Sequence, residues 1–329
     1  MAAQNKLFHI IIFALVLLVA FPVEQANAQG LRVGFYKKTC PVAEKIIRTT
    51  TARYISRVPS LAAPILRMFF HDCFIRGCDA SLLLNTTNSR RPAEKDTPPN
   101  QQLRGWQVID AAKAAVEKRC PGVVSCADIL ALVTRDAVSL IKGPFWQVQT
   151  GRRDGRVSNA NDVRGLPAPT DNITSLKRQF AAKGLSVKDL VVLSGGHTIG
   201  NSHCSSFTTR IYNFTGKGDA DPSMDKNYVR QLKAKCKPRD TTTIVQMDPG
   251  SSKEFDAGYY NMVLKRRGLF ESDSALLRDS STQAYVQQQA RTRSSTFFKD
   301  FSTSMIKLGN VGVLTGRAGD IRKKCAFVN

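Results

Sequence analysis

Histidine is scarce in this sequence of 329 residues, which contains four: His9, His71, His197 and His203. The sequence also shows no alternation of strand and helix patterns, no internal repeat and no low-complexity tract. These absences exclude a parallel α/β sheet, a repeat architecture and a largely disordered chain. After Phe21 no apolar run is long enough to span a bilayer. Because histidine is so scarce, each histidine of the folded protein is a candidate functional residue.

The N-terminus has the three parts of a secretory signal peptide. Lys6 gives a basic start, Leu7 to Phe21 is apolar except for one histidine, and Ala26-Asn27-Ala28 is a small-x-small cleavage site. A membrane anchor is the alternative, but the run is shorter than the roughly 20 residues that a span needs. We expect residues 1–28 to be removed, which leaves residues 29–329 as one large unit or two packed lobes outside the cell.

All eight cysteines follow the expected signal peptide. An even number of cysteines in an oxidising compartment favours disulfides over zinc sites, and the sequence alone does not select a pairing. Export also makes three N-x-S/T sequons candidate glycosylation sites, at Asn85, Asn172 and Asn213.

Acidic residues are few: 26 Asp and Glu stand against 48 Lys and Arg, for a net charge of +22 and a pI of about 9.9. In a nuclear protein this excess would suggest nucleic acid, whereas a secreted protein meets acidic polysaccharide. The basic residues are scattered in twos and threes, as in Arg90-Arg91, Lys265-Arg266-Arg267 and Arg322-Lys323-Lys324. We expect a diffuse positive field, with acidic cell-wall polysaccharide as a candidate partner.

Apolar residues recur with helical spacing along most of the chain, and loops rich in Gly, Pro, Asn and Asp separate the helices. We predict a mainly α protein, in which such long loops indicate bound ligands, metals or covalent links. The predicted helices are Val42–Ile55, Leu61–Phe70, Gly105–Lys118, Cys126–Leu140, Leu176–Lys183, Val187–Ser194, Tyr259–Arg267 and Thr296–Leu308.

Arg67 and His71 are one helical turn apart, so they share a face of an otherwise apolar helix, with Phe70 beside them. This pair suits the cleavage of a peroxide. A neutral imidazole can take a proton from one oxygen and return it to the other. A permanent guanidinium charge stabilises the negative charge that develops as the O–O bond breaks. The alternative is a histidine that caps the end of the helix.

His197 follows Gly195-Gly196, where two residues without side chains let a flat cofactor approach the backbone. One interpretation is an axial haem ligand, and the other is a core histidine with satisfied hydrogen bonds. His203 lies in a polar loop next to Cys204, and we interpret it as structural.

Two segments are rich in the oxygen ligands that calcium prefers. Asp72, Gly77, Asp79 and Ser81 form the first, and a bond between Cys73 and Cys78 would close this loop as a small ring. Zinc is the rival interpretation there, because His71 and two cysteines are close in sequence. The second segment carries Asp248, Ser251 and Asp256, and is either a second calcium site or ordinary turn chemistry.

Several motifs that are each weak alone occur together over nearly all of the chain beyond residue 28. They are Arg67-Met68-Phe69-Phe70-His71-Asp72-Cys73-Phe74, Gly77-Cys78-Asp79-Ala80-Ser81, Val124-Ser125-Cys126-Ala127-Asp128, Gly151-Arg152-Arg153-Asp154 and Leu193-Ser194-Gly195-Gly196-His197-Thr198. In this order and spacing they resemble the secretory haem peroxidases of plants, the class III group.

The resemblance implies a mainly α, two-lobed haem peroxidase fold with four disulfides and one haem b between a distal and a proximal lobe. It implies an enzyme that reduces hydrogen peroxide to water while oxidising donor molecules, phenolics first, by one-electron steps. The alternative is a non-enzymatic cell-wall protein that keeps the fold and binds polysaccharide. We expect a secreted monomer of the extracellular space or cell wall, with neither nucleic acid nor membrane as a partner.

By the same resemblance, Arg67, Phe70 and His71 form the distal site above the haem. Asn100 is expected to accept a hydrogen bond from the His71 ring, with Glu94 supporting Asn100.

On the proximal side the resemblance makes His197 the iron ligand and Asp273 the partner of its other ring nitrogen, which favours high-valent iron. Pro167 is expected at the substrate entrance. Two calcium ions are implied, a distal one held by Asp72, Ile75, Gly77, Asp79 and Ser81 and a proximal one held by Thr198, Asp248, Ser251 and Asp256.

The implied disulfides are Cys40–Cys120, Cys73–Cys78, Cys126–Cys325 and Cys204–Cys236. The sequence also departs from the family pattern. Trp106 stands where the family usually has Phe, and haem-edge positions that are often aromatic are here Pro98, Thr170, Ile199 and Ser206. Aromatic stacking helps to dock phenols, so these departures bear on the choice of reducing substrate.

Overall fold

The structure is a computed structural model that describes residues 30–292 and 294–329. The expected signal peptide, residues 1–28, lies outside the described residues. The helices are α2 (Ala43–Ile55), α3 (Ala62–Ile75), α4 (Pro98–Gln101), α5 (Trp106–Arg119), α6 (Cys126–Leu140), α7 (Ile173–Ala182), α8 (Val187–Ser194), α9 (Thr208–Tyr212), α10 (Lys226–Lys235), α11 (Gly258–Leu264), α12 (Glu271–Ala275), α13 (Ser280–Arg291) and α14 (Ser295–Leu308).

Strands are few and short in the described part of the chain. They form two antiparallel pairs: β1 (Arg32–Val33) with β2 (Gln149–Thr150), and β3 (Asn201–His203) with β4 (Ile244–Gln246). Short 3₁₀ helices fill several connections, and one of them, Gly195–Thr198, carries His197. The prediction of a mainly α protein is confirmed.

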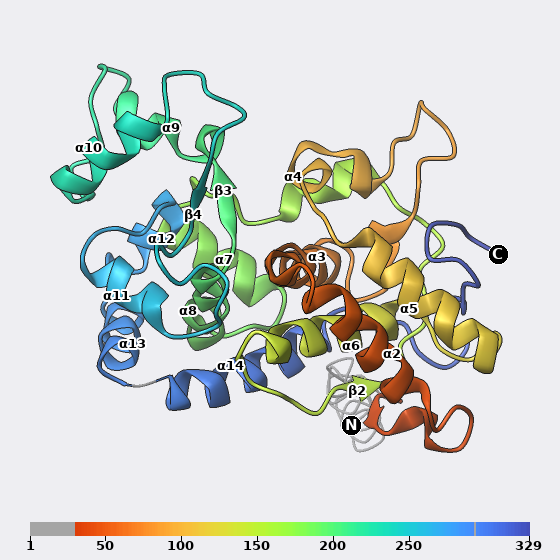
Figure 1. The fold of residues 1–329 in the computed structure, drawn as a ribbon. Helices are drawn as coiled ribbons and strands as arrows, with labels where there is room; N and C mark the ends of the chain where they lie inside the picture. The colour runs from red at the N-terminus through yellow and green to blue at the C-terminus, as the bar shows by residue number, and fades with distance from the viewer. Residues whose placement is uncertain (1–29, 293) are drawn as a thin grey trace, which may run out of the picture.

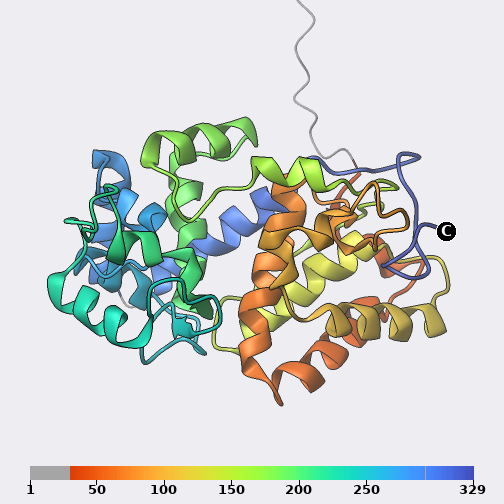
Figure 2. The same ribbon diagram turned by 90° about the horizontal axis from the view of Figure 1, so that it is seen from above.

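The helices form two halves (Figures 1 and 2). Helices α2 to α6 lie in one half, and α7 to α13 lie in the other. Helix α14 runs between them and contacts both α8 and α3. One large hydrophobic core reaches across both halves, and a smaller one lies under α9 and α10. No single described helix is long and apolar enough to cross a membrane, although α2 and Pro59–Ile75 pass that test jointly as a pair bent by 119°.

Local sequence signals explain the helix that leads to His197. The Ser186 side chain accepts a hydrogen bond from the Asp189 amide at 3.1 Å, and the Asp189 carboxylate accepts one from the Ser186 amide at 2.8 Å. This reciprocal capping box fixes the start of α8. Both α6 and α8 have the predicted bounds. Helices α10 and α13 were not predicted, because polar residues dominate their sequences and few apolar residues mark a buried face.

All eight cysteines form disulfides. No thiolate is left to bind a metal, so the zinc interpretation of Cys73 and Cys78 is wrong. The four pairs are those that the family resemblance implies: Cys40–Cys120, Cys73–Cys78, Cys126–Cys325 and Cys204–Cys236.

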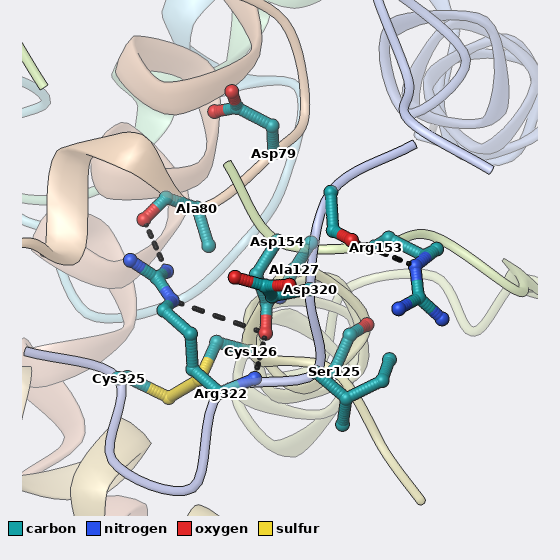
Figure 3. A network of polar contacts seen from close by, with 12 residues as sticks. Asp79, Ala80, Ser125, Cys126, Ala127, Arg153, Asp154, Asp320, Arg322 and Cys325 are labelled. Carbon is teal, nitrogen blue, oxygen red and sulfur yellow. Dashed lines mark hydrogen bonds and ion pairs between the residues drawn. A yellow bond between two sulfur atoms is a disulfide. The ribbon is translucent and has the colours of Figure 1, made fainter. Parts of the chain in front are cut away.

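The C-terminal segment is tied into the core through Arg322, which is fully buried. Its side chain donates a hydrogen bond to the Ala80 carbonyl at 2.6 Å, and its amide donates to Asp154 Oδ2 at 2.8 Å (Figure 3). Of the basic run Arg322-Lys323-Lys324, only the two lysines are exposed, so Arg322 adds little to the expected diffuse positive field at the surface. A run of basic residues in a sequence does not show which residue is paired with a buried carboxylate.

Candidate active site

Helix α3 presents Arg67 and His71 on one face, as the spacing predicts. Arg67 Nε donates to His71 Nε2 at 3.1 Å, and a terminal Arg67 nitrogen donates to the Pro99 carbonyl at 3.1 Å. The helix continues to Ile75, so His71 lies within it and the helix-capping alternative is wrong. The Arg67 side chain is exposed, while the protein around it lowers its pKa by desolvation. The guanidinium is therefore a charge that is accessible to small molecules but only partly hydrated.

Asn100, on α4, determines which nitrogen of His71 carries the proton. Its side-chain amide donates to the Glu94 carbonyl at 2.8 Å and to Thr97 Oγ1 at 3.2 Å, so Oδ1 must be the atom that faces His71. His71 Nδ1 lies 2.6 Å from that oxygen. An amide oxygen only accepts, so Nδ1 must donate and Nε2 keeps its lone pair. Asn100 is fully buried, which protects this arrangement from water.

The surroundings of His71 keep the ring neutral. Burial is the main cause and the positive charge of Arg67 the second, and together they lower the pKa of His71 to about 3, although the bond to Asn100 opposes the shift. Phe70 packs beside it, with ring centroids 6.2 Å from His71 and 4.8 Å from Phe74. A neutral, fixed imidazole with a free lone pair is a general base over the whole neutral range.

Glu94 supports Asn100 through its backbone carbonyl, whereas the Glu94 carboxylate makes no hydrogen bond with Asn100. Both carboxylate oxygens are buried without a hydrogen-bond partner among the described residues, and burial raises the pKa of Glu94 to about 7. The buried hydroxyl of Ser81 has no hydrogen-bond partner within residues 30–292 and 294–329 either. Buried polar atoms are rarely left unsatisfied, so these groups indicate room for an ion or water.

On the other side, the 3₁₀ turn after α8 carries His197, and α12 carries Asp273. His197 Nδ1 lies 2.8 Å from Asp273 Oδ1. Asp273 is buried and also accepts hydrogen bonds from the Tyr259 hydroxyl at 2.9 Å and the Phe270 amide at 2.9 Å. Burial raises the pKa of Asp273, but His197 and these two donors together more than offset it and hold the carboxyl below its usual pKa. The acid is therefore ionised and keeps the Nδ1 proton on His197.

The His197 side chain is 39% exposed, so it is not a core histidine. The rings of Phe270 and Tyr259 meet it edge-on, at 5.3 Å and 5.9 Å between centroids. Nε2 is left as the atom able to bind a metal. Sequence reasoning missed both aromatic residues, although Phe270 lies only three positions before Asp273.

The two glycines before His197 have different roles. A Cβ on Gly195 would lie 2.5 Å from Tyr260 Oη and 2.6 Å from the Phe297 ring, so this position serves close core packing. A Cβ on Gly196 would meet Leu66 of α3 at 3.3 Å. The expectation that both glycines open space for a flat cofactor is therefore wrong for Gly195, which is buried.

The expected distal calcium ligands gather at the end of α3. Asp72 accepts amide hydrogen bonds from Ala80 and Leu82, and burial, with Asp79 and Glu94 nearby, raises the pKa of Asp72 well above its usual value. The Ile75 carbonyl accepts a hydrogen bond from Lys183 Nζ at 3.1 Å. An ammonium there would repel a divalent cation, so Ile75 is the weakest member of the expected set. The Gly77 backbone has a φ of 121°, which turns the chain back towards Asp79.

The expected proximal calcium ligands lie around Asp256. Its carboxylate accepts hydrogen bonds from Thr198 Oγ1 at 2.8 Å and Ser251 Oγ at 2.5 Å. Asp248 Oδ2 is buried and has no hydrogen-bond partner in the part of the chain that the structure describes. Burial, followed by the charge of Asp256, raises the pKa of Asp248 to about 6. Among the described residues no three His, Cys, Asp or Glu side chains form a group that could hold a metal by themselves. Both clusters instead mix carboxylates with hydroxyl and carbonyl oxygens.

The remaining predicted residues are partly buried or exposed, with the exception of Ile199. Pro167 is half-buried in the loop before α7, whose Pro169 carbonyl accepts a hydrogen bond from the Ser272 amide at 3.0 Å. Trp106 donates to the Leu103 carbonyl, and Lys95 lies 4.5 Å above its ring. Of the haem-edge positions, Ile199 is buried in the main core rather than at an edge. The three sequon residues, Asn85, Asn172 and Asn213, are exposed, and each uses its side-chain oxygen as an acceptor.

Comparisons with known proteins agree with this geometry. A family model for peroxidases matches residues 47–292. The chain is 59% identical over 329 residues to "Peroxidase 27" of Arabidopsis thaliana, and each chain is covered completely. It is 56% identical over 304 residues to "Peroxidase 56" of the same plant, covering 92% of both chains. It is 55% identical over 320 residues to "Peroxidase 1" of Oryza sativa subsp. japonica, covering 96% of this chain and 98% of that one. The chain therefore belongs to the peroxidase family, in the class III group of plant peroxidases.

Proposed function

We propose that this peroxidase is a secreted enzyme that binds one haem b through His197 and uses His71 and Arg67 to cleave hydrogen peroxide. Family membership implies a haem cofactor, and the donor set fits one. His197 offers an accessible Nε2 because its Nδ1 is engaged by a buried, ionised Asp273. When bound there, haem iron supplies the redox chemistry that the protein side chains lack.

The single observation that best supports the proposal is the hydrogen-bond chain from Asn100 through His71 to Arg67. It holds the Nε2 lone pair of His71 ready, so His71 can take a proton from one peroxide oxygen and return it to the departing oxygen. Arg67 donates to the same nitrogen, so peroxide would replace Arg67 as the partner of His71. The freed guanidinium then faces the negative charge on the breaking O–O bond.

We propose two calcium ions as structural cofactors. Asp72, Gly77, Asp79 and Ser81, with the Ile75 carbonyl, would hold the distal ion. Burial and the proximity of the carboxyls raise the pKa of Asp72, and burial raises that of Asp79, so a bound cation would stabilise their ionised forms. Thr198, Asp248, Ser251 and Asp256 would hold the proximal ion, supported by the unpartnered Asp248 oxygen.

For the donor side we propose small phenolic molecules that enter past Pro167. We also propose a monomeric protein of the extracellular space or cell wall, glycosylated at Asn85, Asn172 and Asn213 and attracted to acidic polysaccharide. The four disulfides support export. The alternative of a non-enzymatic polysaccharide-binding protein is not favoured, since this chain has Arg67, His71 and His197 and the proteins it is similar to are named as peroxidases.

The test is an absorption spectrum of the purified, haem-reconstituted protein, followed by peroxide-dependent oxidation of a panel of phenols and non-phenolic donors. We expect an intense Soret band that changes in a His197→Ala variant, and turnover of phenols. A protein that folds but binds no haem, or binds it equally well without His197, would refute the assignment.

A further inference from the structure

The buried side chain of Arg210, on α9, uses every nitrogen of its guanidinium. It is 2% exposed. Nε and Nη2 donate to Asp221 Oδ2 at 2.8 Å and 2.7 Å. Nη1 donates to three consecutive backbone carbonyls, those of Gly268 at 2.8 Å, Leu269 at 2.9 Å and Phe270 at 2.8 Å. Nη2 also donates to Ser274 Oγ at 2.7 Å.

These partners lie on both sides of Asp273 in the sequence. The three carbonyls precede Asp273 and Ser274 follows it. The guanidinium therefore binds the turn at the start of α12 on both sides of Asp273. The Asp273 carboxylate itself is hydrogen-bonded to His197 and to the Tyr259 hydroxyl. The turn is tight, because a Cβ on Gly268 would lie 2.8 Å from the Cβ of Asp273.

Asp221 holds Arg210 in turn. Its second carboxylate oxygen accepts from the Ser223 amide at 2.8 Å and the Ser223 hydroxyl at 2.6 Å, and its own amide donates to the Arg210 carbonyl at 2.7 Å. A buried ion pair adds little net stability over apolar residues of similar volume. A fully satisfied polar network does, however, select one geometry for the backbone it binds.

We infer that Arg210, with Asp221, is a positioning residue that fixes the Asp273 carboxylate against His197 and so sets how strongly His197 donates electrons to bound iron. This inference rests on the proposed role of His197 as the haem ligand. A metal-binding histidine becomes more basic when its other nitrogen donates to a well-placed carboxylate. Loosening the turn lengthens that hydrogen bond and makes the ferrous state easier to reach.

The experiment measures the Fe(III)/Fe(II) midpoint potential of the haem-loaded enzyme. Asp273→Asn removes the carboxylate charge and marks the full effect. Arg210→Met/Asp221→Leu replaces the ion pair by apolar side chains without leaving a buried charge. Arg210→Lys keeps a charge opposite Asp221 but cannot reach the carbonyls and Ser274 together. The control is Arg267→Met, which breaks a half-exposed ion pair in the same half of the molecule.

We expect the potential to rise in both Arg210 variants, by less than in Asp273→Asn, and to stay at the parent value in the control. Adding either Arg210 change to Asp273→Asn should produce no further rise, because the effect passes through the carboxylate. A folded Arg210→Lys variant with the parent potential, or an additive rise, would overturn the inference while leaving the proposed function intact. If Asp273→Asn itself leaves the potential unchanged, both the inference and the proposed proximal assignment are wrong.

Discussion

Asn100→Leu tests whether the proton arrangement on His71 matters for the peroxide step. The substitution keeps the side-chain volume and removes the acceptor of the His71 Nδ1 proton, which lies at 2.6 Å in a fully buried position. An unpaired buried donor costs about 1–3 kcal/mol. At about 1.4 kcal/mol per factor of ten, this corresponds to a rate loss of about 5- to 150-fold if all of it enters the barrier.

Two features of the site narrow that range. Arg67 still donates to Nε2 and continues to favour the reactive tautomer. We therefore expect a rate loss in the lower part of this range, about 5- to 30-fold. Protonation does not contribute at pH 7, because the pKa of His71 is about 3. The loss should therefore be independent of pH across the neutral range.

The assay is the second-order rate constant for hydrogen peroxide, measured by stopped flow on haem-loaded protein. Gln101→Ala, at the exposed neighbouring position, is the matched control and should react at the parent rate. The Asn100→Asp variant tests the direction in which the pKa of His71 shifts. A carboxylate accepts the same proton but raises the pKa of His71, so the base is protonated, and the rate lost, at higher pH than in the parent. A parent rate in Asn100→Leu would show that Asn100 does not prepare the base.

Three further predictions follow from the same geometry. Arg67→Leu should slow the peroxide step about 10²- to 10³-fold, and Arg67→Lys less, since a point charge replaces a rigid fork; equal rates in the two variants would argue against a charge role. Exhaustive chelation should remove calcium, lower the melting temperature and reduce activity reversibly, and elemental analysis that finds no calcium in fully active protein would contradict this. Gly195→Ala should lower the free energy of unfolding by about 1–3 kcal/mol through clashes with Tyr260 and Phe297, and an unchanged thermal melt would refute the packing argument.

The sequence could predict those parts of the site that lie within one element. The spacing of Arg67 and His71 on one helix is local information, and the structure keeps them in contact. The bounds of α6 and α8 were likewise available, because apolar periodicity and a Ser cap coincide in both. The pairing of His197 with Asp273, across 76 residues, came only from resemblance to a family.

The sequence could not predict which charged residues are buried. Arg210 and Arg322 look like any surface arginine in a chain with 48 basic residues, yet their exposures are 2% and 0%. Their partners, Asp221 and Asp154, have no signature in sequence, because a buried ion pair depends on how distant segments meet. No sequence motif identifies the backbone carbonyls that Arg210 binds, because every residue type has one.

The two active-site histidines show how one side chain acquires opposite chemistry from its partner. Both rings donate Nδ1–H and keep the lone pair on Nε2, but His71 donates to a neutral amide and His197 to a buried carboxylate. An amide orients the ring without giving it charge, so burial and Arg67 keep His71 a weak base that releases its proton readily. A carboxylate pushes electron density into the ring, which makes His197 the stronger donor to a metal.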